Sequence, residues 1–198
     1  MNDLEKDFEK IIINNKYVLN CSSNKKRDIH SLAYLIDYNL SQSDCIKLDI
    51  GLEFILKDFI LEKCNFIQDI KPKNKKDENE KDHLFIDNKN KIVYFAEIKS
   101  NLNLDTEKSK STYMKCLNIE KELQKKYSDY TIIMFLVCSR YYTKEIIPKN
   151  IKQKYLPINK NLVGLNEYFE KLSIKLKFEN ENEYKNILNL FTSKMFKF

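Results

Sequence analysis

A hairpin pattern in the middle of the chain limits the possible folds more than any other feature of the sequence. Two apolar runs, residues 84–86 and 92–98, flank the polar residues Asn-Lys-Asn-Lys at 88–91. Apolar runs of this length around a short polar group are typical of two antiparallel strands joined by a turn. We therefore expect a β-hairpin here, and its geometry decides which side chains meet.

The centre of the turn, at residues 89–90, fixes which residues face each other across the hairpin. It places Asp82 opposite Glu97. Because side chains alternate between the two faces of a strand, Asp82, Glu97 and Lys99 share one face. Opposed residues have Cβ atoms about 4.5–5.5 Å apart, so two carboxylates there can bind one cation. Asp87 lies at the turn, roughly 17 Å from the level of Glu97, and cannot share that ion.

The shared face combines two carboxylates and an ammonium with apolar surroundings. Facing like charges cost free energy unless a cation or a proton joins them. Mg²⁺ favours hard oxygen ligands and is usually bound through one or two carboxylates plus substrate phosphate. Lys99 can orient a water bound there and offset charge on a phosphoryl transition state. We expect metal-assisted phosphodiester hydrolysis. The alternative is a solvated ion-pair cluster, which the apolar strand around Glu97 disfavours.

An aspartate that opens one strand, a hairpin, and an apolar strand ending in Glu-x-Lys resemble the PD-(D/E)xK nuclease superfamily, and the small size of the chain is similar to that of its type II restriction endonucleases. The motif covers about the middle fifth of the chain. Lys81 stands where the superfamily often has a proline. The resemblance implies an α/β fold with a restriction-endonuclease-like mixed β-sheet flanked by helices. It also implies Mg²⁺-dependent cleavage of double-stranded DNA and a homodimer.

The resemblance further implies roles for single residues. Asp82 and Glu97 are the expected metal ligands, together with Ile98, and Lys99 is the expected water-positioning lysine. Glu53, in the expected helix before the hairpin, is similar to the glutamate in the first core helix of many type II enzymes and joins the catalytic set. A solvated surface glutamate is the alternative for this position. The residues expected to contact DNA, or else to form ordinary loop and surface, are Ser100, Asn101, Lys108, Lys110 and Arg140.

Apolar periodicity predicts helices on both sides of the hairpin. The expected helices cover residues 3–14, 28–40, 44–64, 106–126, 166–176 and 182–198. Asp28 and Asp105 are expected N-caps, and His30, near the first of them, is expected on the surface or satisfied by a partner. Residues 130–138 predict a strand buried on both faces and parallel to the second hairpin strand. Shorter strands are expected at 66–70 and 161–165.

The same periodicity predicts which side of each helix faces the core. In the 44–64 helix, capped by Ser43 or Asp44, the expected core residues are Ile46, Ile50, Phe54, Ile55, Phe59 and Ile60. In the 106–126 helix they are Met114, Leu117 and Leu123, opposite a basic side formed by Lys108, Lys110, Lys115, Lys121, Lys125 and Lys126. Asn166 is the expected cap of the helix that follows it.

Length and composition fit one domain. The 198 residues are expected to form a single nuclease domain, 1–198, with N-terminal helices at 1–65, a catalytic core at about 66–165 and C-terminal helices at 166–198. No apolar run is long enough for a membrane span and no signal peptide is visible, so we expect a cytoplasmic protein. Five scattered cysteines and two histidines argue against a zinc site, a disulfide framework or a His-rich metal nuclease. A net charge of +6 fits a polyanionic partner.

Three functions stay open on these residues. The first is a type II restriction endonuclease that cuts duplex DNA. A junction resolvase or repair nuclease of the same superfamily would use every residue named above. The third is a non-catalytic DNA-binding or interaction protein in which the acidic cluster is structural. If the chain is a nuclease, removal of Mg²⁺ or of the Lys99 ammonium should abolish cleavage and leave binding.

Overall fold

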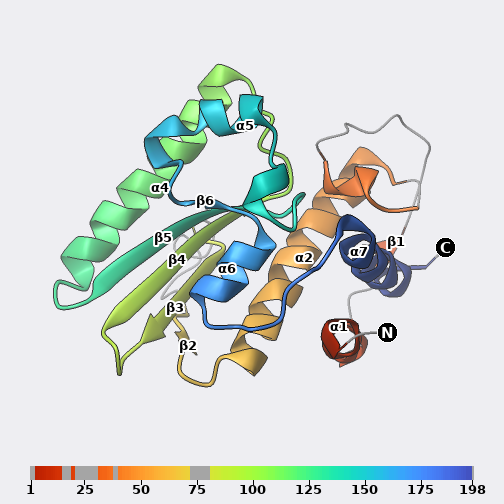
Figure 1. Cartoon of the computed structure of the whole chain (residues 1–198), viewed down its shortest axis with the longest axis horizontal. Helices are drawn as coiled ribbons and strands as arrows, with labels where there is room; N and C mark the ends of the chain where they lie inside the picture. The colour runs from red at the N-terminus through yellow and green to blue at the C-terminus, as the bar shows by residue number, and fades with distance from the viewer. Residues whose placement is uncertain (1–2, 15–18, 21–30, 38–39, 72–80, 198) are drawn as a thin grey trace.

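A computed structural model of the chain describes residues 3–14, 19–20, 31–37, 40–71 and 81–197. In these ranges a five-stranded mixed sheet lies between helices (Figure 1). The predicted α/β class, with a mixed sheet flanked by helices, is therefore confirmed.

The sheet has the strand order β2-β3-β4-β5-β6. Its strands are β2 (Gln68–Asp69), β3 (His83–Asp87), β4 (Ile92–Lys99), β5 (Thr131–Cys138) and β6 (Leu162–Val163). The first three pair antiparallel, whereas β4, β5 and β6 pair parallel. Two parallel neighbours need a crossover connection, and helix α4 (Thr106–Lys126) provides it between β4 and β5. The predicted strand, helix, strand unit is confirmed.

The central hairpin has the predicted register. His83 pairs with Ala96, and Asp87 pairs with Ile92. The connection is the looser four-residue turn, and Lys91 adopts a left-handed conformation there, with φ of 55°. This register puts Asp82, the residue before β3, at the level of Glu97.

One face of the sheet packs against α4 and the short helix α5 (Lys149–Lys154). The buried residues of this layer include Leu84, Val93 and Phe95 from the hairpin. Those from the helical side include Cys116, Ile119, Leu123, Ile151 and Tyr155. The prediction for the core side of α4 is right for Leu123 and wrong for Met114, which is 40% exposed, because the helix is turned so that Cys116 and Ile119 face the sheet.

The other face packs against α2 (Gln42–Lys63) and α6 (Leu165–Lys171). The residues of α2 that face this core are Leu48, Gly51, Leu52, Ile55, Leu56, Phe59 and Ile60. The predicted core positions Ile46, Ile50 and Phe54 are instead exposed, by 54%, 48% and 46%. The prediction is right for Ile55, Phe59 and Ile60. Apolar residues occur on more than one side of this helix, so periodicity alone gave a stripe that is too broad and displaced at the N-terminal half. The helix also begins earlier than predicted, with Ser41 as its N-cap.

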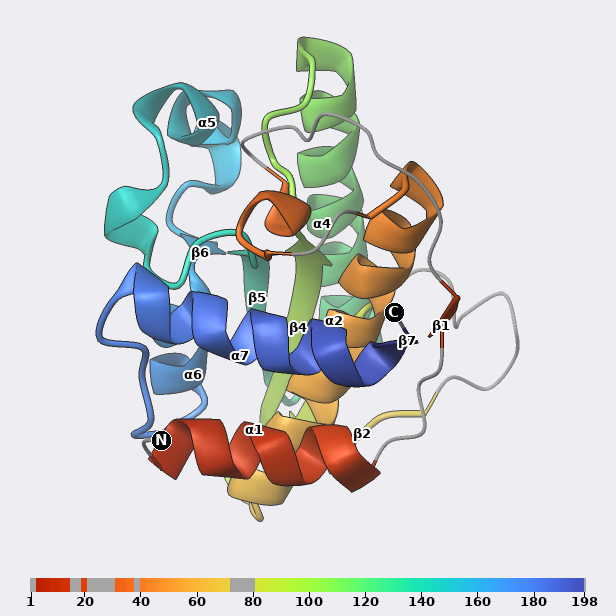
Figure 2. The same cartoon turned by 90° about the vertical axis from the view of Figure 1, so that its right-hand side faces the viewer.

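Helices α1 (Asp3–Asn14) and α7 (Glu181–Met195) lie beyond α2, side by side, as Figure 2 shows. The bounds of α1 agree with the prediction. Its Phe8 ring stacks on Phe59 of α2, with ring centroids 4.3 Å apart. Strand β7 (Phe196–Lys197) follows α7 and pairs parallel with β1 (Leu19–Asn20).

The predicted helix at 28–40 is not found in its described part. Residues 31–37 contain only the 3₁₀ turn Leu32–Tyr34 (η1), while Asp28 and His30 lie outside the described residues. The Asp37 N–H donates to Asn189 Oδ1 of α7 at 2.9 Å, and its carboxylate accepts from Asn189 Nδ2 at 2.8 Å. These contacts attach the segment to α7, so the Asp37 N–H is bonded to a distant side chain and not within a helix.

The bounds of two helices and the burial of one strand also differ from the predictions. Helix α6 is capped by Gly164, and the predicted cap Asn166 instead bonds the main chain of Phe178 (both distances 2.8 Å). The helix ends at Lys171, and Ser173 just beyond it is left-handed, with φ of 60°. The final helix ends before β7. Strand β5 is buried only from Met134 onward, since Thr131 is exposed and the next two residues are half-buried.

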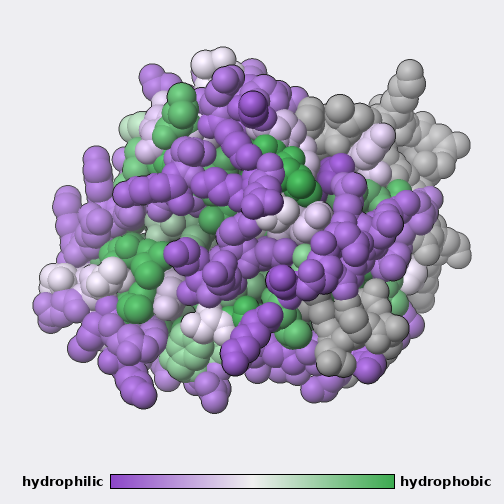
Figure 3. Space-filling view, in the orientation of Figure 1, coloured by the Kyte–Doolittle hydropathy of each residue, from purple (hydrophilic) through white to green (hydrophobic). Residues whose placement is uncertain are grey.

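Most of the molecular face in Figure 3 is hydrophilic, with apolar residues in small separate patches. In the described part of the chain, no helix has the length and apolar character needed to cross a membrane.

Candidate active site

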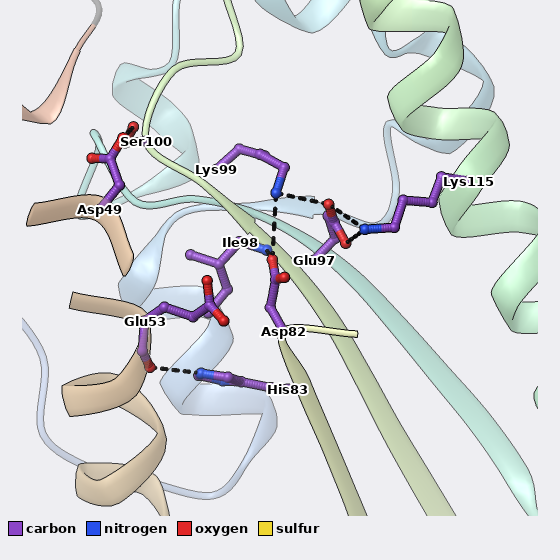
Figure 4. A network of polar contacts seen from close by, with 9 residues as sticks. All are labelled: Asp49, Glu53, Asp82, His83, Glu97, Ile98, Lys99, Ser100 and Lys115. Carbon is purple, nitrogen blue, oxygen red and sulfur yellow. Dashed lines mark hydrogen bonds and ion pairs between the residues drawn. The ribbon is translucent and has the colours of Figure 1, made fainter. Parts of the chain in front are cut away.

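The open end of the hairpin brings Asp82, Glu97 and Lys99 together (Figure 4). Lys99 Nζ lies 2.8 Å from Glu97 Oε1 and 3.5 Å from Asp82 Oδ2. Asp82 Oδ2 also accepts a hydrogen bond from the main-chain N–H of Ile98 at 2.7 Å. Two carboxylates and one ammonium therefore meet at one point, as the register predicts.

Glu97 is the most enclosed member of this cluster, with 1% of its surface exposed. Besides Lys99, it is bound by Lys115 of α4, whose Nζ lies 3.0 Å from Oε1 and 2.8 Å from Oε2. Burial of a carboxylate is costly unless charged partners compensate it, and two lysines do so here. The predicted place of Lys115, on the basic side of α4 and outside the site, is therefore wrong. Its position one turn before Ile119 and two turns before Leu123, which face the sheet, is the signal that identifies it.

Glu53 reaches the cluster from α2, and Figure 4 shows its carboxylate directed toward Asp82. Burial raises the pKa of Glu53 to about 7, and the negative charges of Asp82 and Glu97 add to this effect, while Lys99 opposes it. A third carboxylate thus lies close enough to the hairpin acids for their negative charges to raise its pKa. The position suggested for Glu53 from the sequence is compatible with a role beside Asp82.

Asp49 lies one turn before Glu53 on α2 and is a neighbour of the site that the sequence reasoning missed. Its Oδ2 accepts from the Ser100 hydroxyl at 2.6 Å. Burial raises the pKa of Asp49 to about 6, although the Ser100 hydrogen bond and Lys99 lower it in part. The spacing of four residues between two acids on one helix is the sequence signal for this neighbour.

His83 connects the hairpin to α2. Its Nε2 donates to the main-chain oxygen of Glu53 at 2.9 Å, since a carbonyl can only accept, and its Nδ1 accepts from the Tyr168 hydroxyl at 3.0 Å. Burial lowers the pKa of His83 to about 4, so the ring is neutral near pH 7. These bonds hold the strand that follows Asp82 against the helical turn that carries Glu53.

Lys99 acts in this arrangement as a cation. Burial alone would lower the pKa of Lys99, but the carboxylates of Asp82 and Glu97 outweigh burial and raise it above its ordinary value. Lys99 is therefore protonated near neutral pH. It can donate hydrogen bonds and compensate negative charge, but it is not a proton acceptor.

Asp87 lies at the other end of the hairpin from this cluster. Its carboxylate accepts from the main-chain N–H of Asn90 at 2.9 Å and from the Asn90 side-chain amide at 2.7 Å. Its role is to close the turn, and it takes no part in the carboxylate–lysine cluster.

The residues predicted to contact DNA lie in different surroundings. Ser100 and Asn101 follow Lys99 directly, with Ser100 bound to Asp49. Lys108 and Lys110 are exposed in the first turns of α4. Arg140 is only 7% exposed and forms an ion pair with Glu181 at 3.1 Å. Ser100 and Asn101 thus lie beside the site, and Lys108 and Lys110 face solvent. Arg140 is buried.

The main-chain oxygen of Ile98 is directed to the same side as Asp82. Ser139 N–H donates to the Lys99 oxygen at 3.0 Å, so the main-chain groups of Lys99 face β5. Successive residues of a strand face opposite neighbours, and the N–H and C=O of one residue point the same way. Because the Ile98 N–H binds Asp82, its carbonyl is also on the Asp82 side.

The donor set fits Mg²⁺, which favours carboxylate and carbonyl oxygens. In the part of the chain that the structure describes, no three His, Cys, Asp or Glu side chains are already gathered as a ready-made metal site. The Lys99 ammonium instead bridges Asp82 and Glu97. Burial is the main reason that the pKa of Glu53 is raised, and the charges of Asp82 and Glu97 add to it. A divalent ion bound by these carboxylates, Glu53 and the Ile98 carbonyl would offset that repulsion.

The fold and these contacts define a carboxylate–lysine cluster at the open end of a hairpin in a mixed α/β sheet. Comparisons of the chain with models of protein families, with curated proteins and with solved structures found no match. The assignment of a function therefore rests on the geometry of the chain's own residues.

Proposed function

We propose that the chain is a Mg²⁺-dependent endonuclease that hydrolyses phosphodiester bonds of double-stranded DNA, as a type II restriction enzyme of the PD-(D/E)xK superfamily. One observation carries the proposal. Lys99 Nζ lies within 3.5 Å of carboxylate oxygens of both Asp82 and Glu97 at the end of the hairpin. This is the arrangement that the resemblance implied from spacing alone, and the mixed sheet flanked by helices is compatible with it.

The proposed ligands of the metal are Asp82, Glu97, Glu53 and the main-chain oxygen of Ile98. When bound, Mg²⁺ would act as a Lewis acid on the phosphate oxygens and fix the orientation of the phosphate. Asp82 is held for this role by the Ile98 N–H, and Glu53 is held by the bond from His83 to its main-chain oxygen. The chain thereby presents preorganised oxygens from strand β4, from the residue before β3 and from helix α2.

Lys99 has two proposed tasks. Its ammonium can donate a hydrogen bond to the water that attacks phosphorus, which fixes the direction of attack. It can also compensate the negative charge that develops on the phosphoryl oxygens in the transition state. Both tasks need the protonated form, in agreement with the raised pKa of Lys99.

Duplex DNA as the substrate is supported by charge. The net charge is +6, and exposed lysines occupy the solvent side of α4, which packs beside the site. Such lysines attract the phosphate backbone without reading its sequence. The proposed enzyme acts as a homodimer in the cytoplasm, so that two copies can cut the two strands.

The test is digestion of a fragmented genomic library by the purified protein, with Mg²⁺ or with EDTA, followed by sequencing of the new ends. We expect Mg²⁺-dependent ends that share one short sequence. A library covers long recognition sequences, so intact DNA in the presence of Mg²⁺ would reject the proposal. Mg²⁺-dependent ends without a shared sequence would retain the nuclease and reject restriction.

A further inference from the structure

We infer that Lys115 is a positioning residue of the proposed nuclease, which holds the Glu97 carboxylate so that Lys99 can turn to the substrate. The inference rests on the proposed function and adds a residue to it from a separate element, α4. It assigns different roles to Lys99 and Lys115, which both contact the Glu97 carboxylate.

The contacts of the two lysines with Glu97 differ. Lys115 Nζ contacts both carboxylate oxygens, at 3.0 and 2.8 Å. Lys99 Nζ lies 2.8 Å from Oε1 of Glu97 and also pairs with Asp82 Oδ2 at 3.5 Å. Lys115 therefore forms a two-oxygen ion pair with Glu97, whereas Lys99 lies between Glu97 and Asp82.

Asp82, Glu97, Lys99 and Lys115 are joined by direct ion pairs, and the charges of these four groups balance only when both lysines are counted. Asp82 and Glu97 supply two negative charges, and Lys99 and Lys115 supply two positive charges. If Lys99 moves toward a phosphate, the buried Glu97 keeps a partner in Lys115. Without Lys115, Lys99 would be the remaining ammonium within 4 Å of Glu97 among the described residues, and its departure would leave a buried charge uncompensated.

Lys115 also lies at the edge of a solvent-open hollow beside α4. It is 35% exposed and lines an open hollow of about 460 Å³ along α4. The other residues lining the hollow are Ser111, Met114, Asn118, Ile119 and Glu122. Although it borders this space, the Lys115 ammonium is turned to Glu97, as expected for a residue that acts through another side chain.

The experiment compares Lys115→Met and Lys115→Arg with Lys194→Met, an exposed lysine of α7, outside both the site and the basic side of α4. We expect Lys115→Met to lower kcat by about 10- to 100-fold, the range found when a residue that orients a metal ligand is lost. Lys115→Arg should recover much of this loss, because a guanidinium can bridge both carboxylate oxygens. Lys194→Met should stay within about twofold of the wild type.

Two binding measurements separate positioning from direct contact with DNA or metal. Affinity for duplex DNA in EDTA, and the slope of its salt dependence, should be unchanged in Lys115→Met, whereas a phosphate contact would reduce the slope by about one. Mg²⁺ binding to the DNA-free protein, measured by calorimetry, should be as tight as in the wild type or tighter, because an ammonium has been removed.

Several results would overturn the inference. Wild-type kcat in Lys115→Met, a reduced salt slope, lost Mg²⁺ binding, or equal loss in Lys115→Arg would each do so. A wild-type protein that cuts no DNA would reject the proposed function itself, and the inference with it. A Lys115→Met chain that is folded by circular dichroism and slow only in turnover supports it.

Discussion

Single residues carry the chemistry, and the two aspartates of the hairpin provide the sharpest contrast. Asp82 binds the Ile98 N–H beside Lys99, whereas Asp87 closes the turn through Asn90. We expect Asp82→Ala to lower the cleavage rate by about 100-fold or more, the order of effect seen when one preorganised electrostatic group is removed. The loss would be measured from initial cleavage rates on a duplex that the wild-type protein cuts.

Asp87→Ala is the matched control for that change. It should cut at nearly the wild-type rate and lose about 0.5–1.5 kcal/mol of unfolding free energy, because its hydrogen bonds to Asn90 disappear. Urea unfolding of both variants gives the stability. The reverse pattern, with activity lost only in Asp87→Ala, would refute the assigned register of the site.

Glu53 makes the stability of the metal-free protein depend on pH. The pKa of Glu53 is raised from 4.5 to about 7 by burial and by Asp82. In the folded state its ionised form is therefore disfavoured, so its contribution lowers the unfolding free energy as pH rises from about 4.5 to 7. Glu53→Gln should be more stable than the wild type at pH 8 by about 1–2 kcal/mol, allowing for partial exposure.

The gain in Glu53→Gln should shrink below pH 7 and vanish below pH 4.5, where the wild-type carboxyl is protonated in both states. Denaturant unfolding at several pH values in EDTA would measure it. A gain of the same size at pH 4 and pH 8 would show that packing, not charge, is responsible.

The sequence predicts some residues of the site and misses others for a geometrical reason. Asp82, Glu97 and Lys99 follow from one hairpin, where a turn fixes every pair across the strands. Lys115 and Asp49 come from helices, and their side is known only when the rotation of the helix against the sheet is known. An error in that rotation moved Lys115 from the site to the surface.

Elements with strong local signals were predicted closely. Helix α4 begins after Asp105, whose side chain accepts from the Lys108 N–H at 2.8 Å, as expected for an N-cap. The hairpin and α1 also have near-predicted bounds. Segments that depend on distant partners were not predicted, such as residues 31–37, which bind α7 through Asn189.

Helix α2 offers a test of which side of an element is buried. Ile55 is buried, whereas Ile46 is 54% exposed on the same helix. Ile55→Ala should cost about 2–5 kcal/mol of unfolding free energy through lost burial and a cavity. Ile46→Ala should change it by about 0.5 kcal/mol or less.

Denaturant midpoints of these two variants compare the same chemical change at two positions. Similar losses for both would show that Ile46 is buried as well as Ile55, as periodicity predicts for the two residues. Gel filtration of Ile46→Ala is the accompanying control, because a change in oligomeric state would show that this side is covered in the assembly.

The whole molecule positions the site by packing helices on both faces of the sheet. Helix α2 lies between the sheet and the terminal helices α1 and α7, as Figures 1 and 2 show. Glu53 is thus carried on a helix packed on both sides, and α4 brings Lys115 from the opposite face. Such docking depends on contacts between distant parts of the chain, which local sequence patterns do not contain.

The most direct test of the proposed centre is crystallographic. Crystals soaked in Mn²⁺, which favours the same oxygen ligands as Mg²⁺, would be measured for anomalous scattering. The account predicts one or more peaks within bonding distance of Asp82 and the Ile98 carbonyl, with Glu97 or Glu53 beside them. Peaks only elsewhere, for example at Asp87, or none at Asp82 in crystals that hold Mn²⁺ at other sites, would contradict it.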